Sequence, residues 1–206
     1  MSPLTTREFV QPKSPRSRIW LPLAVFAIML LFVAACVSQP NGATTGESQS
    51  AANVESEPGL PPAPKAGHPA PNFTLVTLDG ESLSLAELQG KPVILNFWAT
   101  WCGPCRLEMP HLEQAYQENL DDNVVILGVN LTQRENNSED IPIFVDEFAL
   151  TFPIVLDEEG DVAKLYEIRG QPASVFINRD GVVNSVFNGP VTKTFIEERI
   201  AELLSS

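Results

Sequence analysis

The sequence has 206 residues, 44% of them hydrophobic, and a formal net charge of −13. Before Cys36 there are four basic residues and one acidic one, whereas the rest of the chain has nine basic and 25 acidic residues. Phosphate backbones repel an acidic domain, so we expect no nucleic-acid partner. Three cysteines are too few for a scaffold held together by several disulfides.

Residues 1–36 have the layout of an export signal or membrane anchor. A basic start precedes an apolar run of 17 residues, Ile19 to Ala35, interrupted only by Pro22. This order places the following chain outside the cytoplasm. The run ends in Val33-Ala34-Ala35-Cys36, which resembles the lipobox of bacterial lipoproteins, where the cysteine receives the lipid. The alternative is an uncleaved membrane helix that contains Cys36, since 17 residues lie near the lower limit for spanning a bilayer.

Residues 37–66 differ from both flanking parts. They are rich in Ser, Gly, Asn, Gln, Glu and Pro and have almost no large apolar side chains. Such a composition cannot bury enough surface to fold alone. We expect a flexible linker that tethers one domain, residues 67–206, to the membrane.

Within that domain, a predicted strand leads directly into Cys102-Gly103-Pro104-Cys105. The strand, Val93 to Ala99, has the β-branched and aromatic residues of a buried strand, and helical spacing of apolar residues follows the cysteines. The first turn of a helix stabilises an anion, which favours a thiolate at Cys102. Cys105 comes one turn later, within reach of Cys102 for a disulfide. The residues thus predict a redox pair.

The string from Phe97 to Cys105, followed by Glu108-Met109-Pro110, resembles the active site of the thioredoxin superfamily. It is most similar to the TlpA/ResA/CcmG branch, whose members are membrane-tethered thiol–disulfide oxidoreductases that act outside the cytoplasm. The resemblance extends from about Gly67 to the C-terminus. It implies a catalytic cycle in which Cys102 is the exposed nucleophile and Cys105 the more buried resolving thiol.

The other predicted elements alternate between strands and helices. A hairpin turn at Asp79-Gly80 and a short helix capped by Ser84 precede the redox strand, and a second hairpin turns at Asp180-Gly181. The pattern Thr194-x-x-Glu197 predicts the start of a closing helix. This order predicts an α/β fold with a mixed central sheet flanked by helices, as in a thioredoxin-like fold.

Residues Ile141 to Leu156 are predicted to form an additional helix and strand. They match the insertion typical of the TlpA/ResA branch.

Glu108 is the candidate proton acceptor for Cys105. Thioredoxin has a buried Asp six residues before its first cysteine, but Asn96 occupies that position here and cannot titrate. Glu108 lies one turn beyond Cys105 and could take this role if burial raises its pKa. The resemblance supports this, since a Glu at this place in ResA-like proteins is functional. The alternative is an ordinary exposed glutamate near Arg106.

Three further residues are expected to dock the substrate. Gln171-Pro172 precedes a predicted strand, and the resemblance implies a cis peptide bond here that faces the cysteines, with Gln171 presenting backbone groups to the bound substrate. Trp101 is expected to cover the sulfurs, whereas Trp98 is expected to be core. Each tryptophan could equally serve packing alone.

The leading functional hypothesis is an extracytoplasmic enzyme that reduces disulfides in exported proteins. By resemblance, the substrate could be apocytochrome c, and a membrane thiol–disulfide donor would supply electrons. A peroxiredoxin-type peroxidase is the alternative, but Leu95 and Ala99 occupy the positions where that motif has Pro and Thr or Ser. A redox-inert binding lipoprotein is a third. We expect a monomer with no cofactor and no metal, since His68 and His111 add too few zinc ligands.

Overall fold

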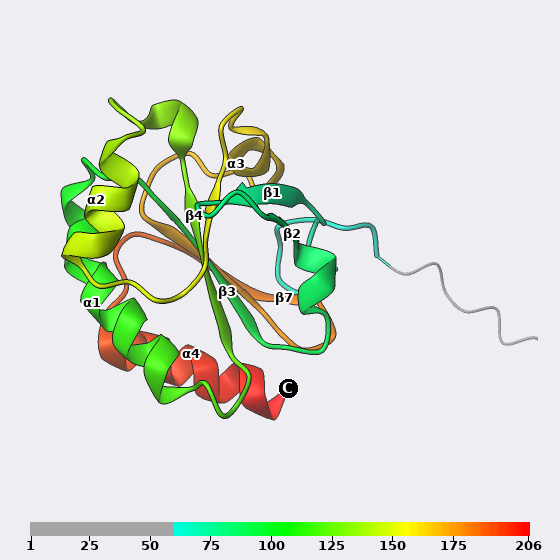
Figure 1. Ribbon diagram of the computed structural model, residues 1–206. Helices are drawn as coiled ribbons and strands as arrows, with labels where there is room; N and C mark the ends of the chain where they lie inside the picture. The colour runs from blue at the N-terminus through cyan, green and yellow to red at the C-terminus, as the bar shows by residue number, and fades with distance from the viewer. Residues whose placement is uncertain (1–59) are drawn as a thin grey trace, which may run out of the picture. The chain divides into compact units, whose positions relative to one another are not determined.

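The computed structural model describes residues 60–206 (Figure 1). The predicted anchor with Cys36 and most of the predicted linker lie outside the described residues. Among residues 60–206, no helix combines the length and the apolar composition needed to cross a membrane. Among the linker residues that are described, Ala63 N donates to the carbonyl of Pro69, at the start of the domain, over 3.0 Å.

Seven strands and six helical segments make up the domain. The strands are β1 (Thr74–Thr77), β2 (Ser82–Ser84), β3 (Val93–Trp98), β4 (Val125–Asn130), β5 (Ile154–Leu156), β6 (Ala173–Ile177) and β7 (Val183–Asn188). The α-helices are α1 (Gly103–Glu118), α2 (Asp140–Glu147), α3 (Asp161–Leu165) and α4 (Lys193–Ser205), and the 3-10 helices are η1 (Leu85–Leu88) and η2 (Thr132–Arg134).

All seven strands form one sheet in the order β2-β1-β5-β4-β3-β6-β7. β4 pairs parallel with β3 and with β5, and the other pairs are antiparallel. The sheet is therefore mixed, as predicted. The predicted insertion supplies α2 and β5, and β5 joins the β1–β2 hairpin to the rest of the sheet.

Both faces of the sheet are covered. Side chains of α1, α2 and α4 pack in one hydrophobic cluster with Ile94 and Trp98 of β3, and η1 and α3 pack in another with Leu95 and Phe97. Successive strand residues point to opposite faces of the sheet. Because both faces are covered, every residue of β3 is buried. This explains why its sequence is continuously apolar apart from Asn96.

The structure shows where the two helices with predicted capping residues begin. The short helix capped by Ser84 is confirmed as η1, with the Ser84 side chain accepting from Ala86 N. The predicted start of the last helix at Thr194 is wrong by two residues. Thr192 is the N-cap of α4, and its hydroxyl accepts from Phe195 N over 3.4 Å. Two threonines in this stretch fit a capping pattern, so the sequence alone does not distinguish them.

Gly128 marks a point of close packing on β4. A Cβ atom here would lie 2.6 Å from Ile154 Cδ1 and 3.1 Å from Trp98 Nε1. Only glycine lets the buried indole of Trp98 approach the strand in this way, which holds the strand before the cysteines close to its neighbour.

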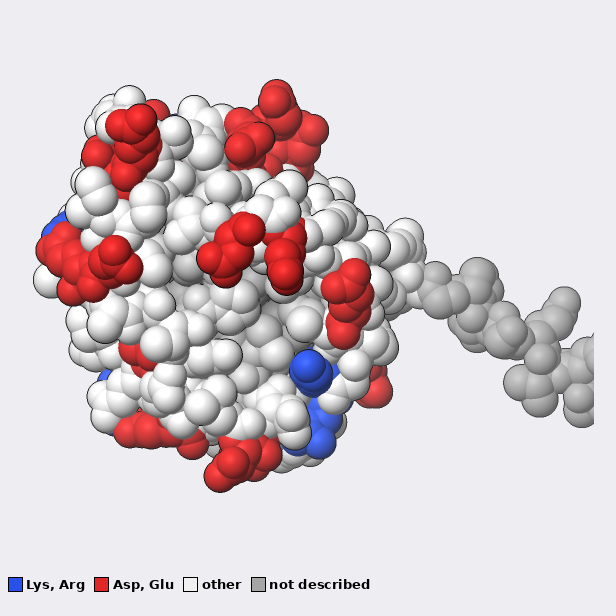
Figure 2. All heavy atoms as spheres, viewed as in Figure 1, with Lys and Arg blue, Asp and Glu red and all other residues white. Residues whose placement is uncertain are grey.

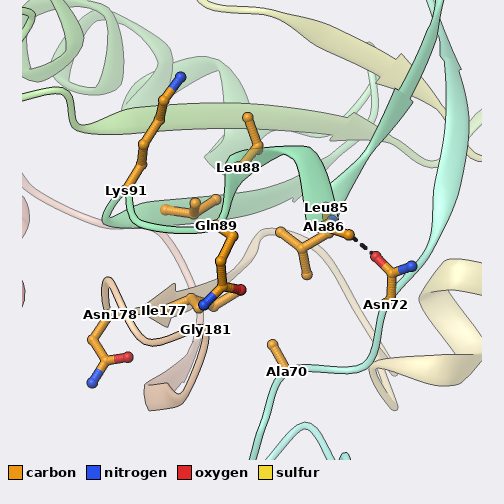
Figure 3. A pocket seen from close by; sticks show the side chains of 11 residues that line it. Ala70, Asn72, Leu85, Ala86, Leu88, Gln89, Lys91, Ile177, Asn178 and Gly181 are labelled. Atoms are coloured by element: carbon orange, nitrogen blue, oxygen red, sulfur yellow. Dashed lines mark hydrogen bonds between the residues drawn. The ribbon is translucent and has the colours of Figure 1, made fainter.

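A small hollow of about 130 Å³ lies between η1 and the β6–β7 turn (Figure 3). Val93 and Ile177, which line it, are register partners at the end of the sheet remote from Cys102. Gln89 occupies part of this region, and a Cβ atom on Gly181 would lie 3.0 Å from its Oε1. The φ of Gly181, +76°, is in the left-handed region that favours glycine in a turn. The hollow is thus separate from the redox pair.

Candidate active site

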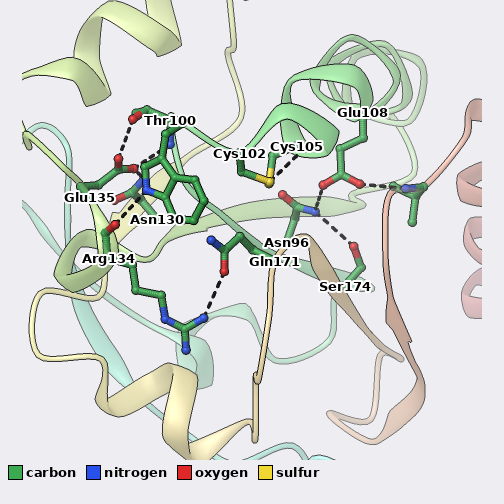
Figure 4. The surroundings of a disulfide bond; sticks show 12 residues. Asn96, Thr100, Cys102, Cys105, Glu108, Asn130, Arg134, Glu135, Gln171 and Ser174 are labelled. Carbon is green, nitrogen blue, oxygen red and sulfur yellow. Dashed lines mark hydrogen bonds between the residues drawn. A yellow bond between two sulfur atoms is a disulfide. The ribbon is translucent and has the colours of Figure 1, made fainter.

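Cys102 and Cys105 form a disulfide at the start of α1, with their Cα atoms 5.2 Å apart (Figure 4). Cys102 is the N-cap of the helix, and its Sγ accepts from Cys105 N over 3.2 Å. A helix start that already directs an N–H at this sulfur would stabilise a thiolate there. The spacing argument for the pair is confirmed by this geometry.

The expectation that Cys102 is exposed is wrong for this disulfide form. Its exposed fraction is 4%, and Cys105 is fully buried. The sequence places Cys102 correctly at the helix start, but it does not show how closely the surrounding loops approach the sulfur. Cys105 is the more buried of the two, as expected.

Glu108 lies in the core, one turn beyond Cys105. Its Oε1 accepts from Asn96 Nδ2 and its Oε2 accepts from Val191 N, each over 2.8 Å. Burial removes the carboxylate from water and raises the pKa of Glu108 to about 7, although both hydrogen bonds act in the opposite direction. The alternative of an exposed glutamate beside Arg106 is therefore wrong, since Arg106 pairs with Glu147 instead.

Asn96 connects Glu108 to the centre of the sheet. Its Nδ2 donates to Glu108 and also to Ser174 Oγ over 3.2 Å, and all three side chains are fully buried. Asn96 Oδ1 has no hydrogen-bond partner within residues 60–206. The amide therefore holds the carboxyl group without adding a second titratable group.

The Gln171–Pro172 peptide bond is cis, as the resemblance implies. The register of β3 and β6 pairs Phe97 with Ala173, so Pro172 comes next to the end of the strand that leads to Cys102. The pairing of Phe97 with Ala173 thus brings two distant parts of the sequence to the same end of these two interior strands. Gln171 is partly buried, and Figure 4 shows its carboxamide oxygen turned toward Arg134.

Trp101 and Trp98 have different surroundings. Trp101 is half exposed and its indole Nε1 donates to the Arg134 carbonyl over 2.8 Å, whereas Trp98 is fully buried and stacks on Phe144. Trp101 is therefore available at the surface beside Cys102. Trp98 is core, as expected.

The loop before Cys102 is held by Glu135, just after η2. The Glu135 carboxylate accepts from Thr100 N over 2.8 Å, from the Thr100 hydroxyl, and from Asn130 Nδ2 over 2.7 Å. These bonds connect the end of β3 to the end of β4. They limit the positions that Trp101 and Cys102 can take.

The comparisons with known proteins agree with this geometry. Residues 66–186 match the AhpC/TSA family. The chain belongs to the AhpC/TSA family. Thiol-disulfide oxidoreductase ResA of Halalkalibacterium halodurans is 43% identical over 134 residues, which cover 65% of this chain and 74% of that protein.

Solved structures support the same assignment for this AhpC/TSA family member. StoA from Bacillus subtilis has a TM-score of 0.57 at 36% identity, covering 64% of this chain and 97% of that one. A secreted Mycobacterium tuberculosis disulfide oxidoreductase homologous to E. coli DsbE has a TM-score of 0.58 at 31% identity, covering 64% and 96%. The chain is a thiol–disulfide oxidoreductase of the ResA and StoA type with a thioredoxin-like fold.

Arg134 and Glu135 of this AhpC/TSA family member were not predicted as site residues from the sequence. They lie in the polar stretch 132–140, where no local pattern marks either side chain. Arg134 contacts both Trp101 and Gln171, and Glu135 holds Thr100. A charged pair shortly after the carboxyl end of a buried strand was the available signal, because sites in α/β folds form at the carboxyl ends of strands.

Proposed function

We propose that this protein reduces disulfides of exported proteins on the extracytoplasmic side of a membrane, to which residues 1–36 attach it. Attachment is through a lipid on Cys36, with the uncleaved helix as the alternative. The basic start and apolar run support export, and one structural relative is described as secreted. The domain works as a monomer in this proposal.

The observation that carries the proposal is the buried Glu108 beside a dithiol at a helix start. The Cys102 thiolate attacks one sulfur of the substrate disulfide, and the other substrate sulfur leaves as a thiolate. Cys105 then loses its proton to Glu108 and attacks Cys102 Sγ, which releases the second substrate sulfur. Two electrons pass to the substrate, and the Cys102–Cys105 disulfide is formed.

The Gly103-Pro104 dipeptide is the one found in thioredoxin, whose reduction potential is about −270 mV. This favours a reductant. We propose apocytochrome c as the substrate class, since the TlpA/ResA/CcmG resemblance points there and its haem-binding cysteines must be reduced before haem attachment. A membrane thiol–disulfide carrier would return the enzyme to its dithiol form.

The excess of acidic side chains on the surface affects which partners the protein can bind. Figure 2 shows acidic side chains spread over the viewed face and few basic ones. This supports the expectation that nucleic acid is not a partner.

The reduction potential of the Cys102/Cys105 couple in the full-length protein tests the proposal. Equilibration in graded thiol–disulfide buffers, read by alkylation of free thiols, gives the value. A potential near −270 mV supports a reductant, and a potential near −120 mV, that of the oxidant DsbA, contradicts it. Consumption of peroxide at the expense of Cys102 and Cys105 thiols would favour the peroxidase alternative. The absence of a two-electron transition would favour the redox-inert alternative.

A further inference from the structure

Arg134 contacts two segments of the active site that lie far apart in the sequence. Its main-chain carbonyl accepts from Trp101 Nε1 over 2.8 Å, and its guanidinium donates to Gln171 Oε1 and to the Ile168 carbonyl, each over 3.1 Å. One residue at the end of η2 therefore connects the segment before Cys102 with the segment before Pro172. Arg134 is only partly buried and belongs to neither hydrophobic cluster of the domain.

The guanidinium determines which way the Gln171 carboxamide faces. An arginine side chain only donates hydrogen bonds, whereas a carboxamide has one accepting oxygen and one donating nitrogen. Contact with Arg134 therefore selects the orientation in which Oε1 faces the guanidinium. Figure 4 shows the oxygen turned toward Arg134 and the nitrogen turned away. Among the side-chain hydrogen bonds of residues 60–206, Gln171 takes part only through Oε1, and its Nε2 donates to none.

The position of this free donor suits the recognition of a polypeptide. Gln171 directly precedes Pro172, beside the strand that leads to the disulfide. An extended peptide carries one carbonyl acceptor in each residue. A donor whose side chain is already held loses little conformational freedom when it binds such a carbonyl.

We propose that Arg134 is a positioning residue that holds the Gln171 carboxamide so that Nε2 donates to a main-chain carbonyl of the polypeptide carrying the substrate disulfide. The inference rests on the proposed function, because it concerns how that polypeptide is bound before exchange. The hydrogen bond from Gln171 Nε2 gives the enzyme a preference for peptide disulfides over small disulfides that have no amide carbonyl. The exchange chemistry itself is unchanged.

Substitutions in the full-length protein separate this role from a structural one. Gln171→Glu keeps an acceptor for Arg134 but removes the Nε2 donor. Gln171→Met removes both, and Arg134→Met removes the group that holds the amide. Arg179→Met is the matched control, since Arg179 is exposed in the turn at the other end of β6.

Two oxidised probes are compared, a cyclic disulfide of an alanine-based hexapeptide with two cysteines, and bis(2-hydroxyethyl) disulfide. The reduced enzyme is mixed with increasing concentrations of each, and oxidation of its dithiol is followed by thiol alkylation. The reduction potential of each variant is measured alongside, because Gln171→Glu adds a charge near the sulfurs.

For both Gln171 variants and Arg134→Met, we expect the half-saturating concentration of the peptide to rise by about fivefold, the size of one lost hydrogen bond. Any loss of rate with bis(2-hydroxyethyl) disulfide, which has no amide carbonyl, should be smaller than the loss with the peptide, as expected for groups that act mainly on peptide binding. Arg179→Met should match wild type with both probes.

A Gln171→Glu variant that matches wild type on the peptide would overturn the inference, since the contact between Arg134 and Gln171 would then be structural only. An equal loss with both probes at unchanged potential would overturn it too. A wild-type protein oxidised by bis(2-hydroxyethyl) disulfide but not by the peptide would overturn the proposed function and the inference with it.

Discussion

Asn96 Nδ2 donates to Glu108 Oε1 over 2.8 Å in the core of the domain, and this bond connects β3 to the active-site helix α1. The strand position that holds an acid in thioredoxin holds an amide here, and the titratable group stands on α1 instead. Glu108 lies one turn beyond Cys105 on the same helix, and both side chains are fully buried. The pKa of Glu108, about 7, lies where such a group can both accept and release a proton near neutral pH.

Glu108→Gln should slow the second step of exchange, the attack of Cys105 on the mixed disulfide, by about a hundredfold above pH 7. In the wild-type protein the rate of this step should rise as pH increases through about 7, because Glu108 must be ionised to accept the proton. The variant should lack this inflection. Single-turnover reduction of a disulfide peptide, quenched with acid and resolved by mass spectrometry, measures the lifetime of the mixed disulfide. An unchanged lifetime in the variant would contradict the role of Glu108.

The stability of the disulfide form should depend on the same group. Glu108 has its pKa raised from 4.5 to about 7 by folding, so between these values the folded state binds a proton that the unfolded state has lost. Stability from this group is therefore greatest below pH 4.5 and falls as pH rises to about 7. The change should be about 3 kcal/mol. Urea unfolding of wild type and Glu108→Gln at several pH values gives it as a difference, and a constant difference would contradict the raised pKa.

Glu135→Ala should loosen the loop that precedes Cys102. The substitution leaves Thr100 N and Asn130 Nδ2 without their acceptor, and we expect the free energy of unfolding to fall by about 2 kcal/mol. The fluorescence of the neighbouring Trp101 should change as well. Glu139→Ala, on the exposed residue before α2, is the control. Equal stability of both variants would show that the Glu135 contacts contribute little.

Gly128→Ala should destabilise the domain by about 1–3 kcal/mol through overpacking. The added methyl group would lie 2.6 Å from Ile154 Cδ1, in the core beside Trp98. Gly170→Ala is the control, because a Cβ atom there meets nothing within 4 Å and its φ is not positive. Thermal unfolding followed by circular dichroism compares the two. Equal melting temperatures would mean that β5 moves aside without cost.

The sequence predicts the parts of the site that depend on local pattern. An uninterrupted apolar strand, a Cys-x-x-Cys pair and a helix with regular apolar spacing each carry their own signal, and the structure combines them as β3, Cys102–Cys105 and α1. The burial of Glu108 follows from its place on the inner face of α1, next to Met109 and Leu112. The cis peptide bond before Pro172 came only from the resemblance, because X-Pro bonds are mostly trans.

Contacts between distant segments could not be predicted in the same way. Arg134 meets Gln171 because β4 and β6 both flank β3, and Val191 N meets Glu108 because the segment before α4 crosses the end of the core. Neither pairing leaves a trace in the local sequence. The burial of Cys102 likewise depends on neighbouring loops rather than on its own position.

The interior place of β3 in the sheet also determines which part of the domain opens last. β3 is paired on both edges and covered on both faces, whereas β2 and β7 are the edge strands. Its amide protons should therefore exchange with deuterium only when the whole domain unfolds, while those at the sheet edges exchange through local opening. The cysteine pair follows a strand that is expected to open only with the whole domain, so local opening at the sheet edges should leave the geometry of the pair unchanged.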